Sequence, residues 1–313
     1  MELPSTYQYK GWKIRYNLTR SNDFTIESPH SRSVVFVHGT PWSSIVFQPT
    51  VKALLAKGPY QILVYDLPGY GQSQTLDSSS HSDNSNDSSN KPLFPGDTSV
   101  KFQAEALSAL LTHTSLPNPS IIAHDIAGAI VLRSHLLHKS NFSKILLVDT
   151  NAVLPWGDGF YKLVRSTPGP FLELPSGIFE AVVRAVVRSA CFDPKVLGRG
   201  WEDALAAPWV GNASDGLGAG EAQRSFVRQI AQADDGDVRE MLDGDLYSEM
   251  RCDVKIIWGE QDQWIPKNKI EELIERMKGR VKEFVVIPEA GHLVMLDQPE
   301  RFAIEVFDWL RKS

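Results

Sequence analysis

Short apolar runs alternate along this chain with longer stretches in which apolar residues recur at helical spacing. This alternation predicts a parallel β-sheet covered by helices on both of its faces. Two early segments, 9–17 and 24–27, are expected to be strands that can run antiparallel, and residues 299–311 have the pattern of an amphipathic closing helix. Buried strands are expected at residues 33–37, 61–65, 120–124, 144–148, 255–258 and 283–287.

Each predicted buried strand ends in a polar or glycine-rich turn. His38-Gly39 follows the strand at 33–37, for example, and Asp149 follows the strand at 144–148. In open parallel sheets, ligand sites lie beyond the carboxyl ends of the strands, which meet at one edge. The turns are therefore expected to converge on a single cleft.

Two segments interrupt the alternation. Residues 77–91 are rich in Ser, Asn and Asp, cannot bury apolar surface, and are predicted to form a disordered surface insertion. Residues 151–250 have helical patterns rich in Pro, Gly and Trp, and they separate the sixth predicted strand from the next. They are expected to form a helical lid, or cap, over the strand ends, while residues 1–150 and 251–313 form the core.

Composition narrows the class of protein. With 313 residues, 42% of them hydrophobic, and a net charge of −6, the chain can form a large core but has no basic stripe for nucleic acid. It contains no apolar run of membrane-spanning length, and its N-terminus lacks a secretory pattern, so a cytoplasmic protein is expected. The two cysteines, Cys191 and Cys252, are expected to be buried thiols, and no motif suggests a metal or cofactor. The oligomeric state is not predicted.

The most informative turn is Ala123-His124-Asp125-Ile126-Ala127-Gly128. An apolar strand precedes it and an apolar helical pattern follows it, with small residues two positions on either side of Asp125. Only small side chains fit where a strand reverses so tightly into a helix, and such a turn exposes its central residue to the cleft. This is the pattern of a nucleophile elbow, with aspartate where serine is usual.

Two more residues follow predicted strands and complete a candidate catalytic triad. His292 lies in a glycine-containing loop, where a neutral imidazole can take a proton from water. Asp262 can accept a hydrogen bond from the other ring nitrogen and fix the tautomer. The order along the chain is nucleophile, acid, histidine. Asp149 is the alternative acid, because it follows the preceding strand.

The turn His38-Gly39-Thr40-Pro41-Trp42 supplies candidate hydrogen-bond donors. The backbone N–H groups of Thr40 and Ile126 are expected to form an oxyanion hole, which stabilises the charge on a tetrahedral intermediate.

Together these motifs resemble the α/β-hydrolase superfamily. They are His38-Gly39-Thr40-Pro41, Asp66-Leu67-Pro68-Gly69-Tyr70-Gly71, the turn at Asp125, Gly259-Glu260-Gln261-Asp262 and Gly291-His292. The aspartate at the elbow is similar to that of the epoxide hydrolase and haloalkane dehalogenase branch. The resemblance implies a mostly parallel eight-stranded sheet with helices on both faces and a helical lid inserted after the sixth strand.

An aspartate nucleophile changes the chemistry that is expected. A carboxylate is ionised at neutral pH and can displace a leaving group from saturated carbon without a base. The product is an alkyl ester on Asp125, which water activated by His292 would then hydrolyse. The expected partners are therefore water and a small organic substrate, hydrophobic because the lid is rich in aromatic residues.

The leaving group separates the candidate reactions. Epoxide opening needs an acid, which the resemblance assigns to lid tyrosines. Halide release needs N–H donors, and dehalogenases commonly place a tryptophan where this chain has Ile126. The residues expected to bind substrate are His38, Trp42, His124, Trp156, Tyr161, Trp209 and Tyr247. An epoxide hydrolase is favoured; a dehalogenase, a lyase or cyclase using the same cleft, and a ligand receptor are the alternatives.

Overall fold

The structure is a computed structural model that describes residues 1–26, 32–77, 93–157, 159–211 and 218–312. Eight strands form one sheet in the order β1-β2-β4-β3-β5-β6-β7-β8. The first two strand pairs are antiparallel and the others are parallel. The strands are β1 (Ser5–Tyr9), β2 (Trp12–Arg20), β3 (Arg32–Val37), β4 (Tyr60–Tyr65), β5 (Ser120–His124), β6 (Lys144–Val148), β7 (Asp253–Gly259) and β8 (Val281–Ile287). The predicted mostly parallel eight-stranded sheet is confirmed.

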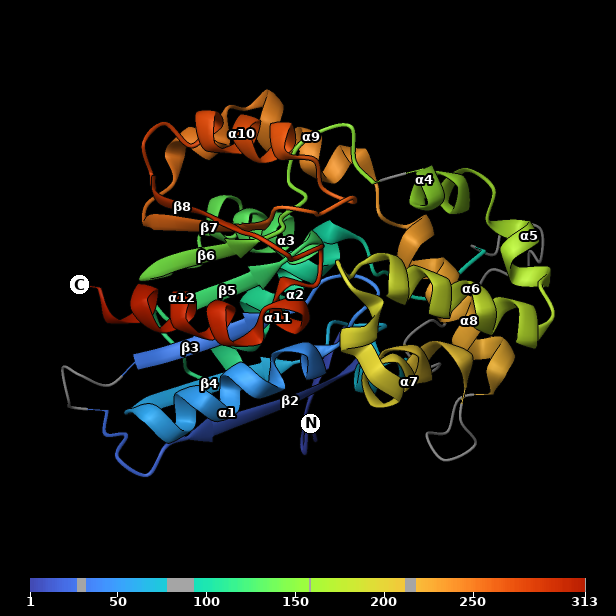
Figure 1. Cartoon of the computed structure of the whole chain (residues 1–313), viewed down its shortest axis with the longest axis horizontal. Helices are drawn as coiled ribbons and strands as arrows, with labels where there is room; N and C mark the ends of the chain where they lie inside the picture. Colours follow the sequence, from blue (N-terminus) through green and yellow to red (C-terminus); the bar gives the residue numbers. More distant parts are fainter. Residues whose placement is uncertain (27–31, 78–92, 158, 212–217, 313) are drawn as a thin grey trace.

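Successive side chains along each strand point to opposite faces of the sheet, where they pack into two separate hydrophobic cores. Val35 and Ile121 point to the face covered by α2 (Val100–His113), α3 (Ile126–Leu136) and α10 (Lys267–Arg276). Their neighbours in sequence point to the face covered by α1 (Gln48–Lys57) and α12 (Pro299–Arg311). Figure 1 shows this arrangement, with α1 and α12 on one face of the sheet. Since buried strands contribute apolar residues to both faces, they appear in the sequence as continuous apolar runs.

The register of the parallel strands brings their carboxyl ends level with one another. Val37 pairs with Ala123, and Val148 pairs with both His124 and Ile257. The turns that follow β3, β5, β6 and β7 therefore begin side by side, as the sequence predicts.

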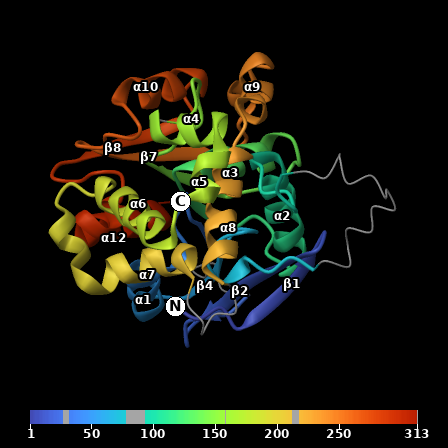
Figure 2. The ribbon, with the colours of Figure 1, turned by 90° about the vertical axis from the view of Figure 1, so that its right-hand side faces the viewer.

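A run of helices separates β6 from β7 and lies beyond the carboxyl ends of the strands (Figures 1 and 2). It contains α4 (Gly159–Ser166), α5 (Pro168–Glu173), α6 (Ser176–Ser189), α7 (Gly198–Val210) and α8 (Ala219–Ala231). The next elements, α9 (Asp235–Asp243) and the 3-10 turn η6 (Leu246–Glu249), pack against α3 instead. The remaining elements are η1 (Ser44–Phe47), η2 (Gly71–Ser73), η5 (Pro194–Leu197) and α11 (Val294–Asp297).

The N-terminal strands differ from the prediction. A turn at Lys10-Gly11, with both residues at positive φ, divides the predicted strand at 9–17 into the hairpin β1–β2. The predicted strand at 24–27 is wrong for residues 24–26, which are not in a strand, and residue 27 lies outside the described residues. The prediction relied on the apolar residues of this segment, but Ile26 is 73% exposed and is not part of the core.

The predicted disordered insertion at 77–91 lies outside the described residues except for Asp77. Among the helices that the structure describes, none has both the length and the apolar character needed to cross a membrane. Cys191 and Cys252 are buried free thiols, which confirms the prediction for both.

Candidate active site

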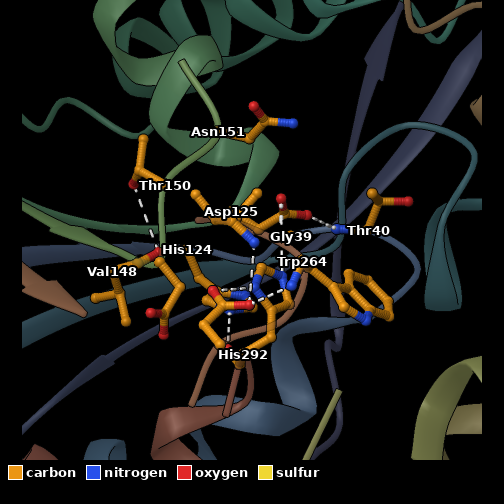
Figure 3. Close-up of polar contacts among 12 residues, drawn as sticks. Gly39, Thr40, His124, Asp125, Val148, Thr150, Asn151, Trp264 and His292 are labelled. Carbon is orange, nitrogen blue, oxygen red and sulfur yellow. Dashed lines mark hydrogen bonds and ion pairs between the residues drawn. The ribbon is translucent and has the colours of Figure 1, made fainter. Parts of the chain in front are cut away.

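Asp125 lies at the sharp turn between β5 and α3. Its backbone has φ 56° and ψ −123°, an unfavourable conformation for a residue with a side chain. Two hydrogen bonds hold it, since its N–H donates to the Val148 carbonyl at 2.9 Å and its own carbonyl accepts from the Gly128 N–H at 3.0 Å. The strained turn presents the carboxylate at the ends of the strands (Figure 3).

Two glycines allow neighbouring segments to approach this turn. A Cβ atom at Gly39 would lie 2.6 Å from the Cβ of Asp125, and one at Gly128 would lie 2.1 Å from Cγ2 of Thr150. Both distances are far below van der Waals contact, so neither position can hold a larger residue without displacing the elbow or a neighbouring segment.

The backbone N–H of Thr40 donates to Oδ2 of Asp125 at 3.0 Å. The backbone N–H of Ile126 also stabilises the charged carboxylate, because both groups oppose the rise in its pKa. Thr40 and Ile126 therefore lie where the sequence predicts the donors of an oxyanion hole, on either side of the Asp125 carboxylate.

His292 lies beneath the elbow and is bonded to Asp262. Its Nδ1–H donates to Oδ2 of Asp262 at 2.9 Å, and both side chains are buried. The other oxygen of Asp262 accepts from the backbone N–H of Trp264 at 2.8 Å and of Ile265 at 3.1 Å. These bonds fix the carboxylate and so fix the imidazole, whose face is stacked on the Trp264 ring at 4.7 Å between centroids.

Asp125 at the elbow and the nearby His292 influence each other's charge. Burial raises the pKa of Asp125 to about 6, although the charge on His292 opposes this rise. Burial of His292 disfavours its charged form, but the carboxylates of Asp262 and Asp125 outweigh burial and raise the pKa of His292 to about 9. Near pH 7.5 the site therefore holds an ionised Asp125 beside a protonated His292.

Asp149, the alternative acid, has a different set of contacts. Its Oδ1 accepts from the Gly259 N–H at 2.7 Å, and Oδ2 has no hydrogen-bond partner among the described residues. Burial, followed by the charge on Asp262, raises its pKa well above the usual value. The imidazole Nδ1 is thus bonded to Asp262, while Asp149 ties the end of β6 to the end of β7.

A pocket of about 510 Å³, partly open to solvent, lies over Asp125 between the strand ends and the helical insertion. Two of the seven residues predicted to bind substrate, Trp156 and Tyr161, line it together with Thr40 and Ile126. The other lining residues are Asn151, Gly157, Arg165, Gln229, Ile230, Ala233, Trp264 and Ile265.

His38 and His124, which were predicted to bind substrate, are not among the residues that line the pocket, and both have hydrogen-bond partners within the protein. Nε2 of His38 accepts from the Leu67 N–H at 2.9 Å, and its Nδ1–H donates to the Gly39 carbonyl at 2.8 Å. Nε2–H of His124 donates to the His292 carbonyl at 2.8 Å. Burial lowers the pKa of both imidazoles, so they position the loops while remaining neutral.

Three aromatic residues predicted to bind substrate, Trp42, Trp209 and Tyr247, also lie outside the pocket lining, with their side chains buried in the core. The Trp209 indole N–H donates to the Pro41 carbonyl at 2.7 Å, and the Tyr247 hydroxyl donates to the Ala152 carbonyl at 2.6 Å. Trp42 is fully buried and stacks on Trp264 at 5.7 Å between centroids. Trp209 and Tyr247 thus donate to backbone carbonyls, and Trp42 packs against a neighbouring ring, in place of the substrate contacts that the sequence suggested.

The sequence interpretation missed several pocket residues. Trp264 could have been found, since it lies two residues after Asp262 in the same turn. Gln229 and Arg165 lie on α8 and α4, where a polar residue in an amphipathic helix gives no signal of its own. Among the described residues, no cluster of three or more His, Cys, Asp or Glu side chains is arranged to hold a metal ion.

Comparison with known proteins gives three results of different strength. The model of the "Alpha/beta hydrolase family" matches residues 34–306 of this chain. The uncharacterized hydrolase YugF of Bacillus subtilis is 21% identical over 297 residues, which cover 91% of this chain and 92% of that protein. The crystal structure of an alpha/beta hydrolase fold protein from Burkholderia ambifaria superposes with a TM-score of 0.80 and 29% identity over 98% of both chains.

The structure of the epoxide hydrolase CorEH also superposes, with a TM-score of 0.71 and 15% identity over 97% of both chains. At this identity the likeness concerns the fold alone.

Proposed function

The chain belongs to the alpha/beta hydrolase family, and from this membership we propose that it is a hydrolase with an aspartate nucleophile that acts on epoxides. The observation that carries the proposal is the state of the Asp125 carboxylate. One oxygen is held at 3.0 Å by the Thr40 N–H, and the other lies 3.8 Å from Nε2 of His292. Residues 151–250 would form the cap that supplies the substrate pocket.

In the first step, the free oxygen of ionised Asp125 attacks a saturated carbon of the substrate. A new C–O bond forms to Asp125, the C–O bond of the epoxide breaks, and the electron pair passes to the epoxide oxygen. The pKa of about 6 leaves Asp125 ionised at neutral pH, and burial makes the carboxylate more reactive than in water.

The developing alkoxide needs a proton, and Tyr161 is our candidate for its donor. Its side chain lines the pocket over Asp125, whereas the Tyr247 hydroxyl is bonded to a backbone carbonyl. We therefore assign the acid to Tyr161 alone, in place of the pair of lid tyrosines expected from the resemblance.

Before the second step, protonated His292 gives its proton back to the Tyr161 phenolate. The neutral imidazole then takes a proton from water, and the hydroxide attacks the ester carbonyl of Asp125. Esterification removes the negative charge of Asp125, which is one of the causes that raise the pKa of His292. The imidazole thus becomes a better base once the ester has formed. The N–H groups of Thr40 and Ile126 would stabilise the tetrahedral intermediate, which collapses to a diol and free Asp125.

Halide release is less well supported than epoxide opening. Among the tryptophans expected to bind substrate, Trp209 donates to the Pro41 carbonyl and Trp42 lies in the core. Trp156 does line the pocket, but its indole N–H donates to the Asn151 carbonyl at 2.9 Å. Two of these indole N–H groups are thus engaged by backbone carbonyls, and Trp42 is not among the residues that line the pocket over Asp125.

The test is a panel of epoxides, haloalkanes and esters incubated with the wild type, Asp125→Asn and His292→Asn. We expect turnover of at least one epoxide by the wild type only, and a stable mass increase on the peptide carrying Asp125 in His292→Asn. In H₂¹⁸O, repeated turnover should introduce the label into Asp125. Full activity of Asp125→Asn would contradict the proposal, and activity with no adduct or label would favour a lyase or cyclase.

A further inference from the structure

Polar side chains along one face of α8 fix this cap helix to the core. Ser225 Oγ donates to the Gly69 carbonyl at 3.2 Å, and Arg228 donates to the Pro95 carbonyl at 3.1 Å. Gln232 accepts from the Thr98 N–H at 2.7 Å and donates to the Gly96 carbonyl at 2.9 Å. Residues spaced by three and four lie on the same helix face, so these bonds hold α8 in one orientation, in front of the strand ends (Figure 2).

Gln229 lies on the same face of α8 but reaches the active site. Its side-chain oxygen accepts from the Tyr70 hydroxyl at 2.7 Å and from the Thr40 hydroxyl at a shorter distance. The residue is 1% exposed, and its Nε2 has no hydrogen-bond partner in the part of the chain that the structure describes. Burying an amide group unpaired costs free energy, so such a group in a pocket indicates a place for a ligand atom.

Thr40 connects this amide to the nucleophile. The Thr40 hydroxyl holds Gln229, while the backbone N–H of the same residue holds Oδ2 of Asp125. Gln229 and Asp125 both line the pocket above the elbow. The two hydroxyl donors engage the oxygen of the amide, so its N–H groups are the part of the side chain left to bind a ligand atom.

We infer that the Gln229 amide binds the leaving oxygen of the substrate as Asp125 attacks the adjacent carbon. This inference rests on the proposed function and names the substrate as one whose departing atom is a hydrogen-bond acceptor, such as an epoxide oxygen. The electron pair of the breaking C–O bond stays on that oxygen, which Gln229 stabilises with an N–H. The amide keeps its hydrogens, and the proton comes from Tyr161.

The experiment measures ester formation on Asp125 in the His292→Asn background by rapid quenching and intact mass, with styrene oxide and 1,2-epoxyhexane. Gln229→Met removes both ends of the amide, and Gln229→Glu keeps the acceptor for Thr40 and Tyr70 but removes the donor. We expect both to lower the maximal rate constant about 100-fold, as loss of one donor to a developing oxyanion does, with little change in the half-saturating concentration.

Gln232→Met is the matched control, because Gln232 is the same residue type one turn along α8 and anchors the helix outside the pocket. We expect it to lower the melting temperature and leave the rate of ester formation unchanged. Equal loss of rate in Gln232→Met and Gln229→Met would overturn the inference, since the effect would then come from anchoring α8. An unchanged rate in folded Gln229→Met would overturn it too. Absence of any ester with Gln229 intact would instead count against the proposed function itself.

Discussion

Nε2 of His292 lies 3.8 Å from Oδ1 of Asp125, beyond hydrogen-bonding distance. The two groups therefore interact through their charges, and each favours the charged form of the other. This relationship divides the proposed reaction into two states. With both groups charged, the nucleophile is ready and the base is not. Once Asp125 is esterified, the pKa of His292 falls, so the imidazole can release its proton to the Tyr161 phenolate and then accept one from water.

The pH dependence of ester formation should reveal this coupling. Below pH 6 Asp125 becomes protonated and loses its nucleophilicity, so the single-turnover rate should fall as the pH drops through about 6. In His292→Asn the positive charge that lowers the Asp125 pKa is absent, and the inflection should move to higher pH. Rapid-quench measurements of the adduct between pH 5 and 9 would check this. An inflection at the same pH in both proteins would show that the two groups are not coupled.

Asp125→Asn should stabilise the folded protein at neutral pH. The folded state raises the pKa of Asp125 from 3.8 to about 6, so it binds this proton more tightly than the unfolded chain does. The ionised side chain therefore opposes folding increasingly as the pH rises from 3.8 to 6, and fully above 6. At 1.36 kcal/mol per pKa unit, the shift corresponds to at most about 3 kcal/mol.

Asparagine stays neutral at every pH and avoids this cost. Denaturant unfolding at pH 8 should show a gain of about 1–3 kcal/mol for Asp125→Asn, and the gain should shrink toward pH 4. A loss of stability at pH 8 would mean that the carboxylate is better solvated than its burial implies.

The two candidate acids should respond differently to the same substitution. Asp262→Asn leaves Nδ1 of His292 without an anionic partner, and we expect ester hydrolysis to fall by about 10⁴, as for the equivalent change in serine triads. Asp149→Asn introduces a neutral group of the same shape that can still accept from the Gly259 N–H, and Asp149 has no bond to the imidazole, so activity should be largely kept. Comparable losses in the two variants would assign Asp149 a part in the proton transfer.

The central strands could be predicted from sequence because they are buried on both faces. β5 and β6 have the predicted bounds, as does α12 with its single apolar face. The sequence pattern did not predict the hairpin β1–β2 as two strands, because its residues are half exposed and the turn at Lys10-Gly11 carries only one glycine. Apolar runs thus locate the interior of the sheet better than its edge.

The candidate site likewise has a part that could be predicted from sequence and a part that could not. Asp125, Asp262 and His292 could be expected to meet, because each follows a parallel strand and register brings strand ends together; their catalytic roles stay predictions. The part supplied by the helical insertion could not be foreseen. Whether Trp156 or Trp209 reaches the pocket depends on which backbone carbonyl accepts its indole N–H, and that is fixed only by tertiary packing.

The same substitution, tyrosine to phenylalanine, can be made at both Tyr161 and Tyr247. Comparing the two variants provides the sharpest test of the proposed acid. Tyr161→Phe removes the hydroxyl of a side chain that lines the pocket, and we expect epoxide turnover to fall by about 10²–10³. Tyr247→Phe removes the bond to the Ala152 carbonyl, which should lower stability by about 1–2 kcal/mol and leave turnover intact. Steady-state rates and thermal melts of both variants would check this. A fall in turnover for Tyr247→Phe matching that of Tyr161→Phe would reinstate a pair of tyrosines, whereas full activity of Tyr161→Phe would point to water as the proton source.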